Sequence, residues 1–275
     1  MLRRRRHLPY KRWQSPSLKQ SPLKDNPLRN PGQSLDEAID TLAYEEAAPW
    51  VVAMLFIIVM TGYEWWRWYA KSPYIPGPMT LMCVGVTAYC LFRLYSFKQQ
   101  IKTLKMARDG EKAVGQYLER LREQGCSVFH DVVSKNFNLD HVIIGPQGIF
   151  TIETKTFRKP VSGNATIHFD GSTIRINGQE CLSNPVTQAI AQANWLSEFI
   201  KESTGHAHSV KPVVVFPGWF VQSDPEVKSS HVWVINPKGL PKFLDKSPQK
   251  LDLEETKLIA YHLSRYIRTQ PSFST

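Results

Sequence analysis

The sequence predicts an α/β sandwich that follows a two-helix membrane hairpin. Three observations lead to this prediction. Two long stretches without charge lie in the first third of the chain, short strand-like segments separated by turn residues follow residue 125, and amphipathic helical patterns flank them. With 275 residues the chain is long enough for one large domain or two smaller ones.

The N-terminal region carries most of the chain's net charge of +10. Residues 1–35 hold nine basic residues and one acidic residue, whereas residues 36–46 hold five acidic residues. Repeated Pro, Ser, Lys and Asn without a helical or strand period predict a disordered basic arm over residues 1–34. Ser34 and Glu37 have the spacing of a helix start, with Ser34 as the cap. The charge excludes an acidic, calcium-buffering chain and favours contact with anionic lipid or nucleic acid.

The two uncharged stretches have the length of membrane spans. Seventeen residues separate Glu46 from Glu64, and 21 residues separate Lys71 from Arg93. A bilayer core requires about 20 apolar residues, and aromatic residues collect where a span meets the interface. The first stretch ends in such a belt, formed by Trp65, Trp66, Trp68 and Tyr69. We therefore expect a transmembrane hairpin at 47–95, with spans at about 47–66 and 75–95. The alternative is a buried helical hairpin in a soluble protein.

Basic residues on either side of the hairpin predict its orientation. The turn around residues 67–75 has two, the N-terminal arm has nine, and five more follow the second span at Arg93, Lys98, Lys102, Lys105 and Arg108. Lys and Arg concentrate on the cytoplasmic side of membrane proteins. We therefore expect an inner-membrane protein of bacterial type with both termini in the cytoplasm. The apolar run starts too far from Met1 for a cleavable signal peptide.

Residues 96–275 read as a cytoplasmic α/β domain. A helical period covers residues 99–124, and Gly125 is a helix stop. Strand patterns follow, then a helix at 185–203, two buried strands and a last helix at 253–267. The expected strands lie at residues 126–133, 139–145, 149–155, 165–169, 172–176, 213–216 and 232–235. The four cysteines have no metal-binding spacing, which favours buried thiols in a reducing compartment.

Chemistry is best placed on the hairpin centred on Gln147. Glu153 and Lys155 lie two residues apart on one strand, so they share a face. A symmetric turn would oppose Asp140 to Thr154, whereas a one-residue bulge at the turn would oppose it to Glu153. In either register the two carboxylates come close enough to share a site.

Two converging carboxylates repel each other unless a cation neutralises them. Oxygen ligands with open positions suit Mg²⁺ or Mn²⁺. A lysine beside them can position a metal-bound water and stabilise negative charge on a phosphate. Asp140 together with Glu153 and Lys155 therefore forms a coherent device for phosphodiester hydrolysis. Taken alone, Glu-x-Lys on a strand is more often an exposed ion pair.

The stretch from about residue 110 to 217 resembles the NERD (nuclease-related domain) family, within the PD-(D/E)xK restriction-endonuclease-like superfamily. The resemblance rests on Asp109-Gly110-Glu111, on the segment from Leu139 to Lys155, and on Asn184-Pro185 with Gln188. It implies a restriction-endonuclease-like α/β/α sandwich with a central mixed sheet.

The resemblance also implies roles for individual residues. Asp140 and Glu153 would bind the metal, Glu111 would complete the acidic cluster, Lys155 would be the catalytic lysine, and Gln188 would line the site. Taken alone, Glu111 equally suits the start of a helix and Gln188 an exposed helix position. Leu139 stands where the superfamily has proline.

These observations predict a membrane-anchored nuclease that depends on Mg²⁺ or Mn²⁺, with DNA as its expected substrate. The alternative is a membrane-anchored binding or scaffold module that keeps the fold without catalysis. It is favoured by the small net charge of residues 94–275, which hold 22 basic and 17 acidic residues, because a nuclease that grips many phosphates needs a basic surface.

Overall fold

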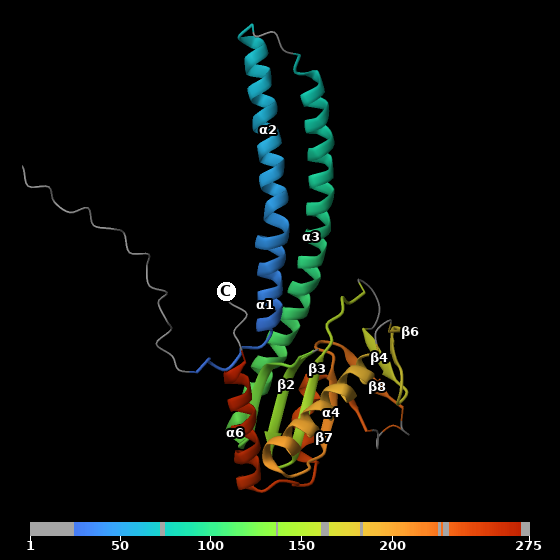
Figure 1. Cartoon of the computed structure of the whole chain (residues 1–275). Helices are drawn as coiled ribbons and strands as arrows, with labels where there is room; N and C mark the ends of the chain where they lie inside the picture. Colours follow the sequence, from blue (N-terminus) through green and yellow to red (C-terminus); the bar gives the residue numbers. More distant parts are fainter. Residues whose placement is uncertain are drawn as a thin grey trace, which may run out of the picture.

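The structure is a computed structural model in which a long helical hairpin rises from an α/β domain (Figure 1). It describes residues 25–71, 75–135, 137–160, 165–181, 184–224, 227 and 231–270. Most of the basic arm, residues 1–24, lies outside the described residues.

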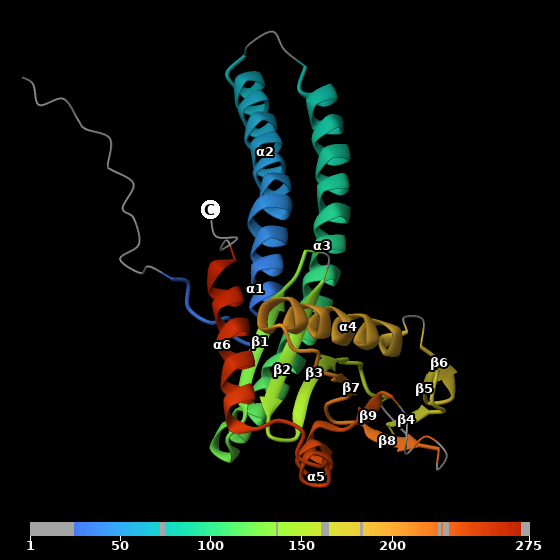
Figure 2. The same ribbon diagram turned by 60° about the horizontal axis from the view of Figure 1, so that its bottom comes forward.

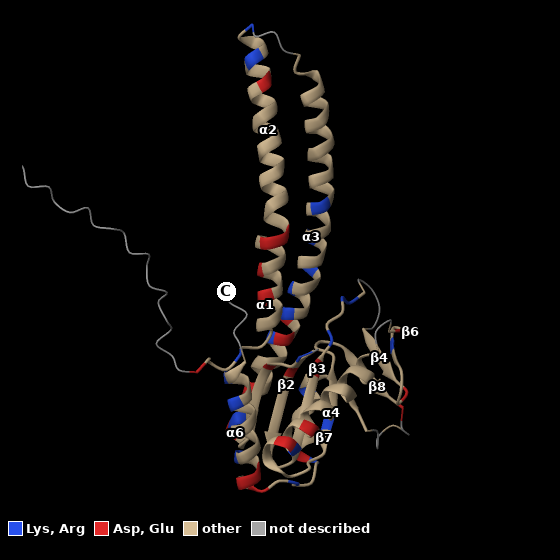
Figure 3. Ribbon diagram, in the orientation of Figure 1, with Lys and Arg blue, Asp and Glu red and all other residues tan. Residues whose placement is uncertain are grey.

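The hairpin consists of helix α2 (Ala48–Tyr69) and the first half of helix α3 (Gly77–Leu118). α2 has 22 residues, which at about 1.5 Å per residue is close to the roughly 30 Å of a bilayer core. Both helices are long and apolar enough to cross a membrane, and only 17% and 11% of their most apolar windows are buried. Figure 3 shows the long uncharged stretch in each helix. The low burial disfavours the alternative of a core hairpin in a soluble protein.

α3 does not stop at the end of the apolar stretch. Its 42 residues run without a break from the hairpin into the domain, where the short helix η2 (Glu119–Gln124) follows. The boundary expected at residue 95 and the separate helix expected at 99–124 therefore fall inside one continuous element. The expected stop is present, because Gly125 has a φ of 83°.

The main sheet has five strands in the order β1-β2-β3-β7-β9. The pairs β1–β2 and β2–β3 are antiparallel, whereas β3–β7 and β7–β9 are parallel, so the sheet is mixed as expected. The strands are β1 (Ser127–Val133), β2 (Asn138–Gly145), β3 (Gly148–Thr154), β7 (Val210–Val215) and β9 (Trp233–Ile235).

Helices cover both faces of this sheet and complete an α/β/α sandwich. One face packs on the end of α3, on η2 and on α5 (Leu240–Asp245), next to the short turn η4 (Pro237–Gly239). The other packs on α4 (Pro185–Thr204) and α6 (Leu253–Thr269). Figure 2 shows α4 crossing the sheet and α5 at the end of the domain away from the hairpin. The mixed α/β architecture is consistent with a nuclease-like fold, as the sequence predicted.

A second, smaller sheet packs beside the first in the order β6-β5-β4-β8. Its strands are β4 (Thr166–Phe169), β5 (Ile174–Ile176), β6 (Gln179–Glu180) and β8 (Phe220–Ser223). The sequence indicated the β4–β5 hairpin but not β6, β8 or α5, which have two, four and six residues and so give no measurable period.

Residues 25–41, here called the N-terminal strap, lie against the domain before the chain enters the hairpin. The strap begins without regular structure and continues as α1 (Gln33–Asp40), the π-helical turn η1 (Thr41–Ala47) and α2. The disordered arm expected at 25–34 is therefore wrong for these residues, because Leu28 packs on a core cluster and Asn26 bonds to the carbonyl of Gln270. Ser34 does not cap α1, since the cap position is Gly32.

Candidate functional site

The hairpin between β2 and β3 sets Asp140 opposite Glu153. Gly145 pairs with Gly148, so the turn has two residues, and the same register continued toward the other end opposes the two carboxylates. Of the two registers that the sequence left open, this is the one in which Asp140 and Glu153 lie directly opposite each other on the same face of the sheet. It arises from the two-residue turn rather than from a bulge. Gly148 has a φ of 125°, a conformation that favours glycine.

Glu153 and Lys155 form a direct ion pair at the end of β3. The Nζ of Lys155 lies 2.6 Å from Oε1 of Glu153 and also donates to Oε1 of Gln188, 2.9 Å away on α4. Glu153 and Lys155, which the sequence placed on one face, are therefore in contact, and Gln188 joins them through Lys155. Glu153 is 2% exposed, so the pair is shielded from bulk water on the carboxylate side.

A second glutamine of α4 holds the other oxygen of Glu153. Nε2 of Gln192 donates to Oε2 of Glu153 at 2.6 Å and to the carbonyl of Asn138 at 3.0 Å. Gln188 and Gln192 are one helical turn apart and so lie on the same face of α4. Sequence reasoning missed Gln192, although its spacing from Gln188 was the one available signal.

Glu111 reaches the site because α3 passes very close to the segment after β3. A Cβ at Gly110 would lie 1.9 Å from Oγ1 of Thr156, so only glycine permits this approach. Gly110 therefore allows α3 to come close enough for the carboxylate of Glu111 to reach the site. Glu111 is 9% exposed, and its charge interacts with those of Glu153, Asp140 and Asp131.

All five residues singled out from the sequence line one cavity of about 810 Å³. Three elements supply them, namely α3 for Glu111, the β2–β3 hairpin for Asp140, Glu153 and Lys155, and α4 for Gln188. The structure therefore brings every expected site residue together. The cavity wall also includes Asp131 of β1, which the sequence did not indicate, and several residues of the N-terminal strap.

Burial and neighbouring carboxylates raise the pKa values of Glu111 and Asp140. Burial, and then the charges of Asp131 and Glu153, raise the pKa of Glu111 to about 8, although Lys155 opposes this. Burial, followed by the charges of Glu153 and Glu111, holds the pKa of Asp140 well above its ordinary value. The backbone N–H of Thr154 donates to Oδ2 of Asp140 at 2.7 Å and acts in the opposite direction. Such crowding is the electrostatic condition that a bound cation relieves.

The donor set fits Mg²⁺ or Mn²⁺ bound through few protein ligands. Asp140 and Glu153 offer carboxylate oxygens with Glu111 nearby, and Mg²⁺ usually keeps several waters beside one or two carboxylates. Within the described part of the chain, no group of three or more His, Cys, Asp or Glu side chains has a metal-binding arrangement. Binding through Glu153 would require one of its oxygens to leave Lys155 or Gln192.

The histidines in the part of the chain that the structure describes do not line the cavity. His141 is fully buried on the opposite face of β2, where its Nδ1 lies 2.8 Å from Nδ1 of His130. This agrees with the packing role expected for it. His206 and His208 belong to the stretch between α4 and β7, away from the cavity residues.

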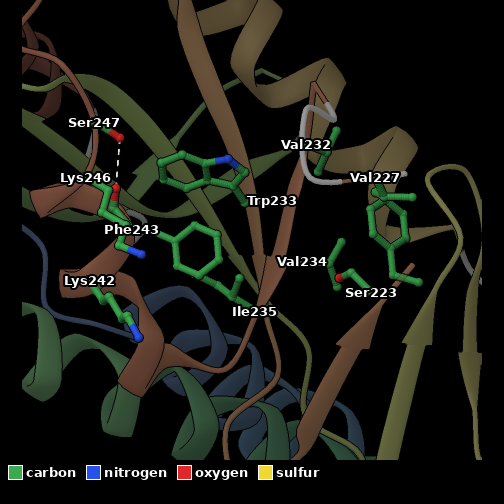
Figure 4. Close-up of a pocket in the computed structure, with 11 residues that line it drawn as sticks. Ser223, Val227, Val232, Trp233, Val234, Ile235, Lys242, Phe243, Lys246 and Ser247 are labelled. Carbon is green, nitrogen blue, oxygen red and sulfur yellow. Dashed lines mark hydrogen bonds between the residues drawn. The ribbon is translucent and has the colours of Figure 1, made fainter. Parts of the chain in front are cut away.

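A second hollow, of about 410 Å³, lies between the two sheets beside α5. Figure 4 shows Trp233 and Phe243 on one side of β9, Val232 and Val227 on the other, and the ammonium groups of Lys242 and Lys246 at the rim. None of the five expected site residues lines it. The chemistry indicated by the sequence therefore belongs to the larger cavity.

The comparison with protein families agrees with the resemblance read from the residues. Residues 107–217 match the family model NERD, described as nuclease-related domain. The matched range runs from α3 through β7 and contains all five expected site residues. The chain matches none of the curated proteins and none of the solved structures with which it was compared.

Proposed function

We propose that this chain is a membrane-anchored nuclease that hydrolyses phosphodiester bonds in the presence of Mg²⁺ or Mn²⁺, with DNA as the first substrate to test. The observation that carries the proposal is the convergence of Asp140, Glu153 and Lys155 with Glu111 and Gln188 on one cavity inside a nuclease-related domain.

Each side chain has a role that its contacts support. Asp140 and Glu153 would hold the cation, which supplies charge neutralisation at a phosphate and a more acidic water. Lys155 is fixed by Glu153 and Gln188, and its remaining N–H can donate to a phosphate oxygen or to the attacking water. Gln188 aims the ammonium group, and Gln192 fixes the carboxylate of Glu153.

The anchor rests on the hairpin. Two helices of sufficient length and apolarity, largely exposed and ending in an aromatic belt, favour insertion into a bilayer. The basic residues of the arm and of α3 beyond Arg93 favour placing both termini and the domain in the cytoplasm of a bacterial cell, with the arm against anionic lipid. Accessibility of N- and C-terminal tags to protease in sealed inner-membrane vesicles tests this. Opposite accessibility of the two tags would contradict the two-span topology.

Cleavage should be tested on the full chain in detergent micelles, because a fragment that starts at residue 96 would cut α3 and remove the N-terminal strap. Single-stranded and duplex DNA and RNA are incubated with Mg²⁺, Mn²⁺ or a chelator. We expect metal-dependent cleavage that Glu153→Ala and Lys155→Ala abolish. The matched controls are Glu198→Ala and Lys201→Ala, an exposed ion pair on α4, which should leave the rate unchanged.

The rival function is a membrane-anchored scaffold that keeps the fold without catalysis. It is favoured by the closed contacts of Glu153, whose two oxygens are both bound by side chains, and by the lack of a three-ligand metal group among the described residues. Absence of cleavage of all four substrates by the intact chain with either metal would support the scaffold and reject the nuclease.

A further inference from the structure

The N-terminal strap forms one wall of the proposed nuclease cavity. The strap comes from the segment that precedes the first membrane-length helix, whereas the catalytic candidates come from the domain after the second. Strap residues that line the cavity are Arg29, Ser34, Leu35, Glu37, Ala38 and Thr41. The cavity is therefore bounded on one side by a segment that the nuclease-related domain does not contain.

The inner contact of the strap is a buried carboxylate on β1. Asp131 is 2% exposed and has a φ of 51°, an unusual backbone conformation for a residue other than glycine. Its Oδ2 accepts from Nε of Arg29 at 2.6 Å and from the backbone N–H of Ser34 at 2.9 Å, and the Ser34 hydroxyl donates to Oδ1. Arg29 also pairs with Glu37 within the strap at 2.8 Å. The strap thus neutralises a carboxylate whose charge otherwise faces Glu111.

The outer contact consists of two ion pairs, whose residues do not line the cavity. Asp36 of α1 accepts from Arg108 at 3.0 Å and from Lys112 at 2.6 Å, both on α3. The Asp36 side chain is 38% exposed and that of Lys112 is 41% exposed, so this contact is weak and can open. The strap is thus joined to the domain by two contacts of unequal burial, a buried one with Asp131 of β1 and a more exposed one between Asp36 and α3.

We infer that the N-terminal strap is an autoinhibitory cover of the cavity, which a nucleic-acid strand enters only when the strap moves away. The inference rests on the proposed function, because the proposed nuclease residues line the cavity that the strap bounds. The strap continues through η1 into α2, so a displacement of the membrane hairpin is transmitted directly to it. Membrane state would then control access to Glu153 and Lys155.

The test opens the outer contact without touching the cavity wall. Asp36→Lys replaces two attractions by two repulsions, and Asp36→Lys with Lys112→Asp restores one of them. Asp40→Lys makes the same charge change at an exposed position of α1 and serves as the matched control. Each change is made in a full chain in which the four free cysteines are replaced by alanine and which also carries Ala107→Cys, at a cavity-lining position of α3. Labelling by a polyethylene-glycol maleimide is timed against the same chain without the change in the strap.

We expect Asp36→Lys to speed labelling at position 107 by about three- to tenfold, as the loss of two partly exposed ion pairs implies. The double variant should recover much of the slow rate, Asp40→Lys should not differ, and DNA cleavage should rise in parallel with labelling. Thermal melting identifies a variant that has lost its fold, and for such a chain Asp36→Asn gives the same comparison with a milder change.

The outcomes separate the cover from the nuclease activity. Faster labelling of Asp36→Lys without cleavage by any of the chains would support the strap as a cover of the cavity and would reject the proposed nuclease function. Equal labelling of Asp36→Lys and the parent would overturn the cover. Faster labelling with reduced cleavage would also overturn the inhibitory role, because the strap would then help to bind the substrate.

Discussion

Removing the ionisable group of Glu111 should stabilise the protein, and the gain should grow with pH. The pKa of Glu111 is raised from an ordinary 4.5 to about 8 by burial and by the charges of Asp131 and Glu153. Between these values the folded chain retains a proton that the unfolded chain has released, so folded stability falls as pH rises. Each pH unit in this window removes up to about 1.4 kcal/mol, or about 4 kcal/mol between pH 5 and pH 8.

The amide that Glu111→Gln introduces carries no charge at any pH. This variant therefore does not lose folding stability through this group as the pH rises. We expect its melting temperature to be close to that of the unsubstituted chain near pH 5 and to exceed it by roughly 8–16 °C at pH 8, since each kcal/mol shifts a domain of this size by roughly 2–4 °C. The assay is tryptophan fluorescence during heating of the full chain in detergent with a chelator. Titrating groups that do not interact with Glu111 cancel in this difference.

The control is Glu198→Gln, at an exposed position of α4, which should give no pH-dependent difference. Mg²⁺ in place of the chelator should narrow the gap at pH 8, because a bound cation removes the repulsion that raises the pKa of Glu111. A gap of equal size at pH 5 and pH 8 would refute the electrostatic reasoning and point to a packing effect of the amide.

Three further predictions follow from single contacts. Gln192→Ala should lower metal-dependent cleavage by about 10- to 100-fold through loss of its bond to Glu153, measured as initial rate across a Mg²⁺ titration. Gly110→Ala should destabilise the chain by about 1–3 kcal/mol in thermal melts, since its methyl group would overlap a threonine hydroxyl, whereas Gly62→Ala, with no atom within 4 Å of the new methyl, should be neutral or stabilising. Adding His141→Asn to the Glu111→Gln chain should affect the melting temperature more favourably at pH 5 than at pH 7, because burial holds the pKa of His141 well below 6.5, and the stability lost when only the unfolded imidazole gains a proton disappears with that side chain.

Each of these three has an outcome that contradicts it. A Gln192→Glu chain that retains the rate of the parent would show that donation to Glu153 is unimportant. Equal melting of the two alanine variants would mean that α3 does not approach the end of β3 as closely as the structure has it. An effect of His141→Asn on the melting temperature that is equal at pH 7 and pH 5 would mean that His141 is not held neutral in the folded chain.

The site was largely predictable because its residues are close in sequence. A two-residue period put Glu153 and Lys155 on one face, and a short turn limited Asp140 to two registers. The choice between the two registers depends on the length of the turn, which itself depends on the backbone conformation of Gly148. Gln188 and Glu111 came from the family resemblance, since nothing in a helical pattern distinguishes them from surface residues.

Contacts between distant segments could not be predicted from any local pattern. The bond between Gln192 and Glu153 joins residues 39 positions apart, and the contact of Ser34 with Asp131 spans 97. Residues 25–32 show no helical or strand period, so their composition indicated disorder. In the structure, however, Leu28 packs against a core cluster and Arg29 bonds to the buried carboxylate of Asp131. The continuity of α3 was hidden for another reason. Hydropathy changes near residue 95, but backbone hydrogen bonds do not respond to hydropathy, and no Gly or Pro lies between Gly85 and Gly110.

This continuity gives the candidate site a fixed distance from the membrane, if the hairpin spans it as proposed. Glu111 lies 18 positions after Arg93, where the uncharged stretch ends, and at a rise of about 1.5 Å per residue this part of α3 extends about 27 Å. At physiological ionic strength, dissolved ions screen the interaction between two exposed charges that lie more than about 8–10 Å apart. A nucleic-acid backbone at the cavity would therefore be little repelled by anionic lipid, even with the hairpin inserted as proposed. The helix then acts as a spacer, and access depends on the strap rather than on the charge of the membrane surface.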